Sequence, residues 1–275
     1  MIELTGQNAE STTALSTAPI PETPNCEAPS RLATLLEARA PLEVLGLAAR
    51  LRSLAAAPRG DRRPVLLVPG YLADGYSMAP LGTFLKFLGY RVLDWGLGRN
   101  RGDVEEDILR LGGQVEKISE ALGSEALGSK TLVSEPLTLI GWSLGGVLCR
   151  EVARLYEPRV REVITFGTPI VGGPKYTAVA QMMVRLKDID LPILEQDILR
   201  RNRLGLRQPV ASIFSKSDGV VGWRSSVDVF NSQARNIEVT GSHLGLGLNA
   251  EVWLTIADLL ATDAAPPEAL RRDAA

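Results

Sequence analysis

Between residues 59 and 265 the chain alternates short apolar runs with stretches in which apolar residues recur every three or four positions. Short apolar runs bounded by Pro, Gly or charged residues are typical of buried parallel strands. The strands predicted in this way are 65–68, 91–95, 137–141, 160–166, 210–214 and 236–239. Helical spacing follows at 81–88, 103–121, 144–156 and 250–260. This alternation predicts an α/β domain whose six mainly parallel strands carry helices on both faces.

The connection from Phe166 to Val210 is too long for a simple crossover between neighbouring strands. It contains a stretch with helical spacing that begins at Thr177. We therefore expect a largely helical cap, inserted at about residues 171–208. A short tail, residues 266–275, is expected to follow the domain.

The first 30 residues carry four Glu and no Lys or Arg, and they are rich in Ser, Thr, Pro and Ala. This composition predicts a disordered acidic tail over 1–30, and it matches neither a secretory signal nor a transit peptide. Residues 1–28 are therefore expected to be dispensable for folding and turnover, and the protein is expected to be cytoplasmic.

Residues 31–58 form a separate segment whose leucines recur at helical spacing. Ser30 is a good helix cap and Pro41 interrupts the helix, so two helical stretches are expected. Leucines left in water would be costly, so this helical arm is expected to pack on the domain. A partner-binding or membrane-surface helix is the alternative.

Composition excludes several classes of protein. The 30 basic and 32 acidic residues leave a net charge of −2, so no global positive field would hold nucleic acid or an anionic membrane. The longest nearly apolar run, 137–149, is too short to cross a bilayer. Two cysteines and one histidine make neither a disulfide framework nor a multi-histidine metal centre.

The sequence Gly141-Trp142-Ser143-Leu144-Gly145 matches the pattern G-x-S-x-G, directly after a predicted strand and before a predicted helix. This strand–turn–helix context is what a nucleophile elbow requires, because the turn exposes the serine at the end of the sheet. The following helix supplies partial positive charge and free N–H groups. Ser143 is therefore the predicted nucleophile.

A serine hydroxyl needs a base, and His243 is the one histidine of the chain. It follows the last predicted strand in a glycine-rich loop, where this motif class places its base. The third member should be a carboxylate between the two in sequence. Asp218, in a turn after the strand 210–214, is preferred, and Asp228 is its rival.

Two backbone N–H groups are expected to form an oxyanion hole, those of Leu144 and Tyr71. Leu144 follows the nucleophile, and Tyr71 lies in the loop after the first strand, where Gly70 permits a sharp turn. Met182 and Met183 of the predicted cap would suit an acyl chain, and Trp142 is a further candidate for substrate binding.

Five stretches resemble the α/β-hydrolase superfamily, in particular bacterial serine esterases and lipases. They are Val65-Leu-Leu-Val-Pro-Gly-Tyr-Leu, Ile140-Gly-Trp-Ser-Leu-Gly-Gly, Phe166-Gly-Thr-Pro, Ser217-Asp-Gly-Val-Val and Gly241-Ser-His-Leu-Gly-Leu. The resemblance covers about residues 60–262 and implies hydrolysis of carboxylic esters by a serine nucleophile, without a cofactor. The chain has Pro69-Gly70 where many lipases have His-Gly, a form similar to that of polyester hydrolases and cutinases.

The sequence thus predicts a Ser-His-Asp hydrolase that forms an acyl-enzyme intermediate on a small-molecule ester or a lipid. No nucleic-acid partner, metal or cofactor is expected, and the sequence leaves the oligomeric state open. Acyl transfer, thioester cleavage and polyester hydrolysis by the same triad are the alternatives, followed by a non-catalytic binding protein.

Overall fold

Six strands form one sheet in the order β2-β1-β3-β4-β5-β6, in a computed structural model that describes residues 25–127, 135–187 and 190–262. Its strands are β1 (Pro64–Val68), β2 (Arg91–Asp94), β3 (Leu137–Trp142), β4 (Val160–Phe166), β5 (Val210–Phe214) and β6 (Arg235–Glu238). All neighbouring strands are parallel. The predicted sheet is therefore confirmed, and the strand bounds differ from the prediction by at most one residue at each end.

The helices that flank the sheet are also those that the sequence predicts. They are α4 (Gly75–Leu88), α5 (Val104–Leu127), α6 (Leu144–Leu155) and α9 (Ala250–Thr262). Helix α4 begins earlier than predicted, because Asp74 caps it by accepting a hydrogen bond from the Tyr76 N–H at 3.1 Å. Single-turn 3₁₀ helices η2 (Glu157–Arg159), η4 (Trp223–Ser226) and η5 (Leu246–Leu248) lie in the connections.

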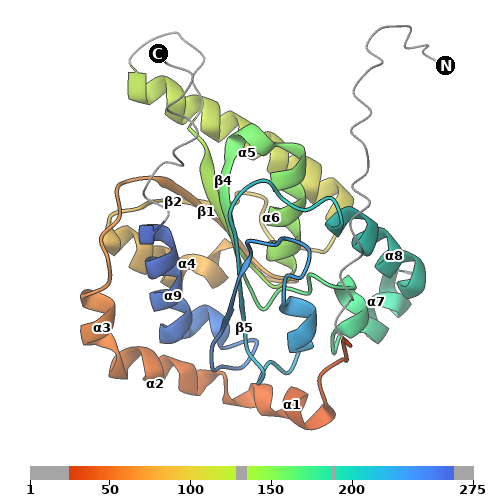
Figure 1. The fold of residues 1–275 in the computed structure, drawn as a ribbon. Helices are drawn as coiled ribbons and strands as arrows, with labels where there is room; N and C mark the ends of the chain where they lie inside the picture. The colour runs from red at the N-terminus through yellow and green to blue at the C-terminus, as the bar shows by residue number, and fades with distance from the viewer. Residues whose placement is uncertain (1–24, 128–134, 188–189, 263–275) are drawn as a thin grey trace, which may run out of the picture.

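Both faces of the sheet are covered, so the central strands β1, β3, β4 and β5 are buried at successive positions, whereas the edge strands β2 and β6 keep partly exposed side chains. In β1, Val65 and Leu67 belong to the core under α4 and α9, whereas Leu66 and Val68 belong to the core under α5 and α6. Figure 1 shows the two helix pairs on opposite sides of the sheet. This arrangement fixes the strands rigidly and leaves the loops at their carboxyl ends to carry a site.

The long connection between β4 and β5 forms the predicted cap. It contains η3 (Gly173–Tyr176), α7 (Ala180–Lys187) and α8 (Leu191–Asn202). The two longer helices lie together at one side of the molecule (Figure 1). Asp190 caps α8 by accepting a hydrogen bond from the Ile193 N–H, so the helix starts where the sequence supplies a polar cap.

The helical arm runs along one end of the molecule as a curved series of short helices (Figure 1). They are α1 (Arg31–Leu35), η1 (Leu36–Arg39), α2 (Pro41–Ala49) and α3 (Leu51–Ala55). Ser30 caps the first of them by accepting a hydrogen bond from the Ala33 N–H, as its sequence predicts. Leu54 and Ala57 join the core under α4 and α9, which anchors the end of the arm.

The outer part of the arm departs from the expectation that its leucines pack on the domain. Leu32, Leu35 and Leu45 are among seven large apolar side chains of the arm that are 45% to 74% exposed. The arm instead turns its carboxylates toward the domain, as described below. Most of the predicted acidic tail and all of residues 266–275 lie outside the described residues; in the part of that tail that is described, Cys26 is buried.

Removing residues 1–58 is expected to lower the melting temperature by about 10 °C or more. The deletion removes Leu54 and Ala57, which exposes the part of the core that they cover, and it also removes the buried Glu37. A thermal melt of this variant beside full-length protein and a variant lacking residues 1–24 measures the effect. Equal melting temperatures for the full-length chain and the variant lacking 1–58 would show that the arm does not stabilise the domain.

Candidate active site

Ser143 occupies a sharp turn between β3 and α6. Its φ of 54° and ψ of −123° are a strained conformation for a residue other than glycine. Residues with such strain are found mainly at functional sites. The turn is possible because its neighbours are glycines. A Cβ on Gly145 would lie 2.3 Å from the Val68 carbonyl oxygen, and one on Gly141 would lie 2.4 Å from the Gly146 Cα. The geometry is that of a nucleophile elbow.

The elbow brings Ser143 into a chain of hydrogen bonds with two distant residues. His243 Nε2 lies 3.1 Å from Ser143 Oγ, and His243 Nδ1 lies 2.7 Å from Asp218 Oδ2. The other carboxylate oxygen of Asp218 accepts hydrogen bonds from the Val220 and Val221 N–H groups at 2.9 and 2.7 Å. Asp218 is thus fixed as an acceptor for the Nδ1 proton, which leaves Nε2 to accept a proton from the serine.

The rival carboxylate, Asp228, is engaged elsewhere. It accepts a hydrogen bond from Arg150 at 2.7 Å, and both side chains are buried. Burial alone would raise the pKa of Asp228, but the charge of Arg150 and hydrogen bonds from Arg150, Asn231 and Phe230 hold it below its ordinary value. Arg150 and Asp228 thus form a buried ion pair that joins α6 to the segment before β6. The carboxylate beside His243 is that of Asp218, which the sequence favours.

His243 is buried, and burial favours its neutral form. The Asp218 carboxylate outweighs this effect by its charge and hydrogen bond, and the charge of Glu37 adds to it, so the pKa of His243 is raised. Since His243 must be neutral to accept the serine proton, kcat/KM is expected to rise with pH through one ionisation above 6.5. A pH profile measures this, and full activity well below that pH would contradict it.

The predicted oxyanion-hole residues lie beside the serine. Tyr71 and Leu144 both line the cavity that Ser143 borders. A Cβ on Gly70 would lie 3.2 Å from Ser143 Cβ, so the loop after β1 passes directly against Ser143. The Leu144 N–H is at the first turn of α6, where helix N–H groups have no partner within the helix.

Asn100, which the sequence analysis missed, holds this loop in place. Its side chain is fully buried and donates a hydrogen bond to the Pro69 carbonyl oxygen at 2.9 Å. Its backbone bonds to Leu72 and Ala73 at 2.7 and 2.8 Å. No local motif marks Asn100 in the sequence, because its partners belong to a different loop.

A cavity of about 260 Å³ opens at Ser143. Its wall is mostly apolar and comes from the loops after β1 and β5, the start of α5, α6 and the cap. It includes Pro174, Val179, Met183, Leu194, Ile198 and Val220. Met183, one of the predicted substrate-binding residues, lies in this wall. Met182 is not part of it and is 39% exposed. Trp142 is also outside the wall, since its ring stacks on Phe166 and lies against His243, with centroids 5.9 Å apart in the latter pair.

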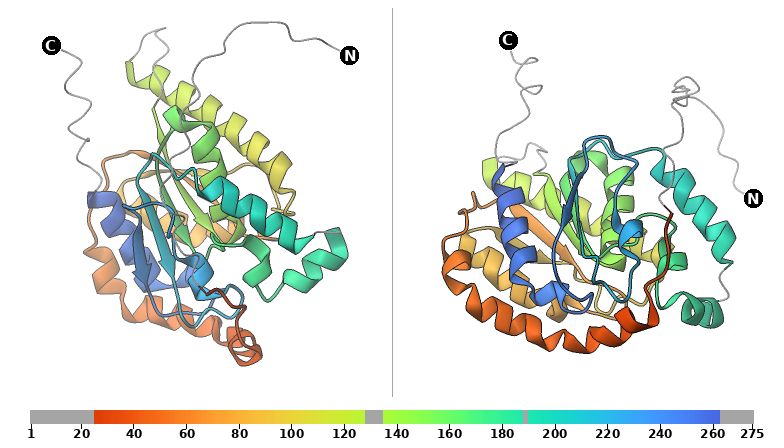
Figure 2. Two further views of the ribbon diagram at one scale, coloured as in Figure 1. Left: turned by 45° about the vertical axis from the view of Figure 1, so that its right-hand side comes forward. Right: turned by 60° about the horizontal axis from the view of Figure 1, so that its bottom comes forward.

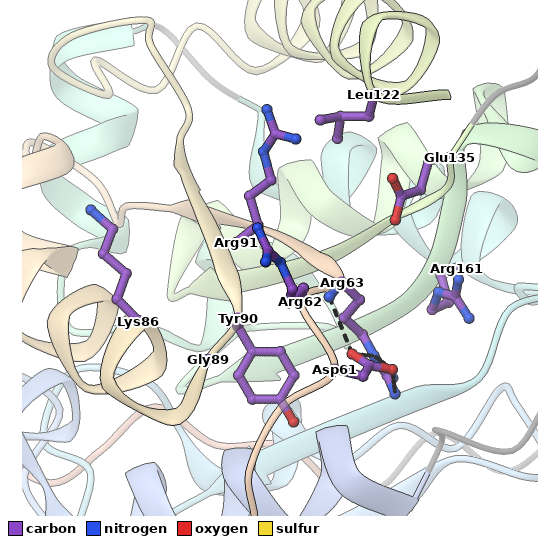
Figure 3. Close-up of a pocket in the computed structure, with 10 residues that line it drawn as sticks. All are labelled: Asp61, Arg62, Arg63, Lys86, Gly89, Tyr90, Arg91, Leu122, Glu135 and Arg161. Carbon is purple, nitrogen blue, oxygen red and sulfur yellow. Dashed lines mark hydrogen bonds and ion pairs between the residues drawn. The ribbon is translucent and has the colours of Figure 1, made fainter. Parts of the chain in front are cut away.

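A larger cavity of about 830 Å³ lies at the amino ends of the strands (Figure 3). Its charged lining comprises Asp61, Arg62, Arg63, Lys86, Arg91, Glu135 and Arg161. Arg63 is held by Asp61 at 2.9 Å, as the dashed lines in Figure 3 mark. No residue of the hydrogen-bonded triad borders this cavity, and its charged wall does not suit an acyl chain.

Glu37 of the helical arm is a second residue that sequence reasoning missed. It is only 7% exposed, and one carboxylate oxygen accepts hydrogen bonds from the Gly219 N–H at 2.7 Å and the His243 N–H at 2.8 Å. The other oxygen accepts from the Leu244 N–H at 2.9 Å. Glu37 therefore joins the loop that carries Asp218 to the loop that carries His243.

Further contacts of the arm strengthen this junction. Glu43 accepts hydrogen bonds from the Ser242 N–H at 3.2 Å and from the Asn249 side chain at 2.7 Å. Thr34 donates to the Gly219 carbonyl oxygen at 2.7 Å. The right-hand view of Figure 2 shows the arm, in orange and red, along the end of the molecule where these loops lie. The arm is thus part of the support of the site.

Within the described ranges, no three His, Cys, Asp or Glu side chains come together as metal ligands. Cys26 and Cys149 are both buried thiols, and burial raises the pKa of the Cys26 thiol to about 11.

Of the helices in the described part of the chain, none is long and apolar enough to cross a membrane.

Comparison with solved structures identifies the fold as that of the α/β-hydrolases. The chain is similar to a monoglyceride lipase from Saccharomyces cerevisiae (16% identity, 77% of this chain and 91% of that one, TM-score 0.52). It is also similar to a Paleococcus ferrophilus monoacylglycerol lipase (15%, 76% and 97%, TM-score 0.51) and a Bacillus anthracis bromoperoxidase (15%, 74% and 93%, TM-score 0.50). No protein-family model and no curated protein sequence matches the chain.

Proposed function

We propose that the protein is a serine hydrolase that cleaves carboxylic esters through an acyl-enzyme intermediate. The observation that carries the proposal is the hydrogen-bonded series Ser143, His243 and Asp218 at a strained elbow beside an apolar cavity. Neighbours of this fold include lipases and a bromoperoxidase, so the fold alone does not select a reaction and the argument rests on the site.

In the acylation step, Ser143 Oγ attacks the ester carbonyl carbon while its proton moves to His243 Nε2. The carbonyl π electrons move to the oxygen, where the Tyr71 and Leu144 N–H groups stabilise the negative charge. The tetrahedral intermediate then collapses and expels the alcohol oxygen, which takes the proton from His243. The acyl group remains on Ser143, and Asp218 stabilises the imidazolium that forms in between.

In the deacylation step, a water molecule takes the place of the alcohol. His243 removes a proton from it as it attacks the acyl carbonyl carbon, and the same two N–H groups stabilise the oxyanion. Collapse releases the carboxylic acid and returns the proton to Ser143 Oγ. The residues of the site thus return to their initial state without a cofactor.

The substrate is a small-molecule ester or a lipid whose acyl group enters the apolar cavity. Its volume of about 260 Å³ is near the lower end of the ~300–1,000 Å³ typical of ligand pockets. We therefore expect a preference for short to medium acyl chains. Met183, which can adopt several side-chain conformations, would adapt the wall to chains of different length.

A fluorophosphonate probe and a series of p-nitrophenyl esters test this function. The probe should label Ser143 and abolish hydrolysis, and turnover should fall as the acyl chain outgrows the cavity. Ser143→Ala is the control and should show neither labelling nor turnover. Labelling of a different residue, or hydrolysis by the Ser143→Ala variant, would contradict the proposal. Added alcohols that compete with water for the acyl group would reveal transfer in place of hydrolysis.

A further inference from the structure

The helical arm turns most of its large apolar side chains toward solvent and its two carboxylates toward the domain. In α2, every residue except Glu43 and Leu47 is exposed, and every exposed residue is apolar. Seven of the sixteen strongly exposed large apolar side chains in the described part of the chain come from the arm: Leu32, Leu35, Leu36, Leu42, Val44, Leu45 and Leu51. A concentration of this kind marks a surface for interaction, whereas single exposed leucines need no explanation.

The exposed charges of the arm all have one sign. Arg31, Arg50 and Arg52 are exposed, while the carboxylates of Glu37 and Glu43 accept hydrogen bonds from the domain. The outer surface of the arm is therefore apolar and positively charged, although the whole chain has a net charge of −2. The net charge of the chain therefore gives no indication of this local positive surface.

The arm lies at the end of the molecule that carries the site. Glu37 contacts the loops that follow β5 and β6, and the right-hand view of Figure 2 shows the arm running across this end. Leu72 and Leu244, which belong to the loops after β1 and β6, are also more than half exposed. Exposed apolar side chains thus lie on two loops at this end of the molecule as well as on the arm.

We propose that the arm docks the protein on an anionic lipid surface. An apolar helical face bordered by arginines fits such a surface, because the leucines enter the acyl boundary and the guanidinium groups meet the phosphates. Docking at this end would bring the site to lipid esters, so the proposal rests in part on the proposed ester hydrolase function. The occupant is thus a lipid surface, the alternative to packing on the domain that the sequence leaves open for this segment.

Two other occupants fit the surface less well. A symmetric contact between two copies would place the arm against itself, and its exposed charges are all positive. The preceding segment, residues 1–24, is acidic but supplies only Met1, Ile2, Leu4, Leu15 and Ile20 as large apolar residues. Neither offers both the apolar area and the negative charge that the arm requires.

Flotation of the full-length protein with lipid vesicles tests the proposal. Vesicles of phosphatidylcholine with added phosphatidylglycerol should bind the protein, and phosphatidylcholine alone should bind it more weakly. The double variant Leu42→Ser/Leu45→Ser should lower the partition coefficient at least about tenfold. Arg50→Gln/Arg52→Gln should lower it by about fivefold for each arginine, on anionic vesicles only.

The double variant Leu109→Ser/Leu155→Ser is the matched control, because each of these leucines is 63% exposed, as Leu42 is, but lies outside the arm. It should bind vesicles as the unchanged protein does. Hydrolysis of a dissolved short-chain ester should be unchanged in the Leu42→Ser/Leu45→Ser variant, which shows that the site is intact.

Flotation does not depend on turnover. Absence of esterase activity would therefore contradict only the proposed function, whereas absence of lipid binding would contradict only the docking of the arm. Equal vesicle binding by the Leu42→Ser/Leu45→Ser variant and the unchanged protein would overturn the proposal. Binding that requires removal of residues 1–24 would identify that segment as the occupant. A dimer that depends on Leu42 and Leu45, without vesicle binding, would identify a second copy.

Discussion

Replacing His243 with glutamine is expected to lower kcat for ester hydrolysis by about 10⁴- to 10⁶-fold. Glutamine has an amide in place of the imidazole, so it cannot accept the Ser143 proton and pass it to the leaving alcohol. No second histidine exists in the chain to take over this role. Steady-state kinetics on a short-chain p-nitrophenyl ester measures the loss.

The variant must be folded for this result to concern catalysis. Its thermal melt and far-UV circular dichroism should stay close to those of the unchanged protein, apart from the lost hydrogen bond to Asp218. Addition of imidazole to a folded but inactive His243→Ala variant is a second check, because alanine leaves the space of the ring open to the free base. Turnover of the His243→Gln variant at the original rate would show that another group is the base.

Replacing Glu37 with alanine is expected to lower the free energy of unfolding by about 3–5 kcal/mol and kcat by about 100-fold. The substitution leaves three N–H groups without their acceptor, those of the buried Gly219 and His243 and that of the partly exposed Leu244. The loops that hold Asp218 and His243 would then no longer be joined. Chemical denaturation and steady-state kinetics measure the two effects.

Glu37→Gln separates a positioning role from a purely structural one. The amide keeps the shape but loses the negative charge that helps to raise the pKa of His243. The acid limb of the kcat/KM profile should therefore move to lower pH, which loss of stability alone would not cause. Glu43→Gln, which affects only the loop after β6, should have a smaller effect on kcat, and Glu27→Gln on the surface should have none. An unmoved acid limb would contradict this role.

The sheet and the elbow could be predicted because both depend on residues close in sequence. The central strands β1, β3, β4 and β5 are buried on both faces, so apolar residues fill most of their positions and mark them in the sequence. The conformation of Ser143 depends on Gly141, Gly145 and the helix that follows, and these are adjacent in the chain. Local sequence was therefore sufficient to locate the strands and the predicted nucleophile.

The choice between Asp218 and Asp228 could be argued only from position in the chain. What separates them in the structure is Arg150, which lies 78 residues before Asp228 and pairs with it inside the domain. A sequence pattern does not show which of two buried carboxylates meets an arginine and which meets a histidine.

The arm shows where the usual assumption about apolar residues fails. Its leucine spacing predicted a face packed on the domain, but Glu37 and Glu43 face the domain and most leucines face solvent. The partners of Glu37 are backbone N–H groups far away in sequence. Gly219 lies 182 positions after Glu37, and His243 lies 206 positions after it. A glutamate among leucines carries no local sign of such partners.

The distance along the chain between Glu37 and the loops that it joins also affects how the protein reaches its native state. Contacts between residues so far apart form late, because closing long loops costs entropy before the contacts compensate for it. The strands and helices can form from nearer neighbours, whereas the junction at Glu37 needs segments that lie 182 to 207 positions apart. During refolding, far-UV circular dichroism should therefore recover before hydrolytic activity. During synthesis, the arm leaves the ribosome before the domain does, so it cannot complete the site until residues near 243 have also emerged.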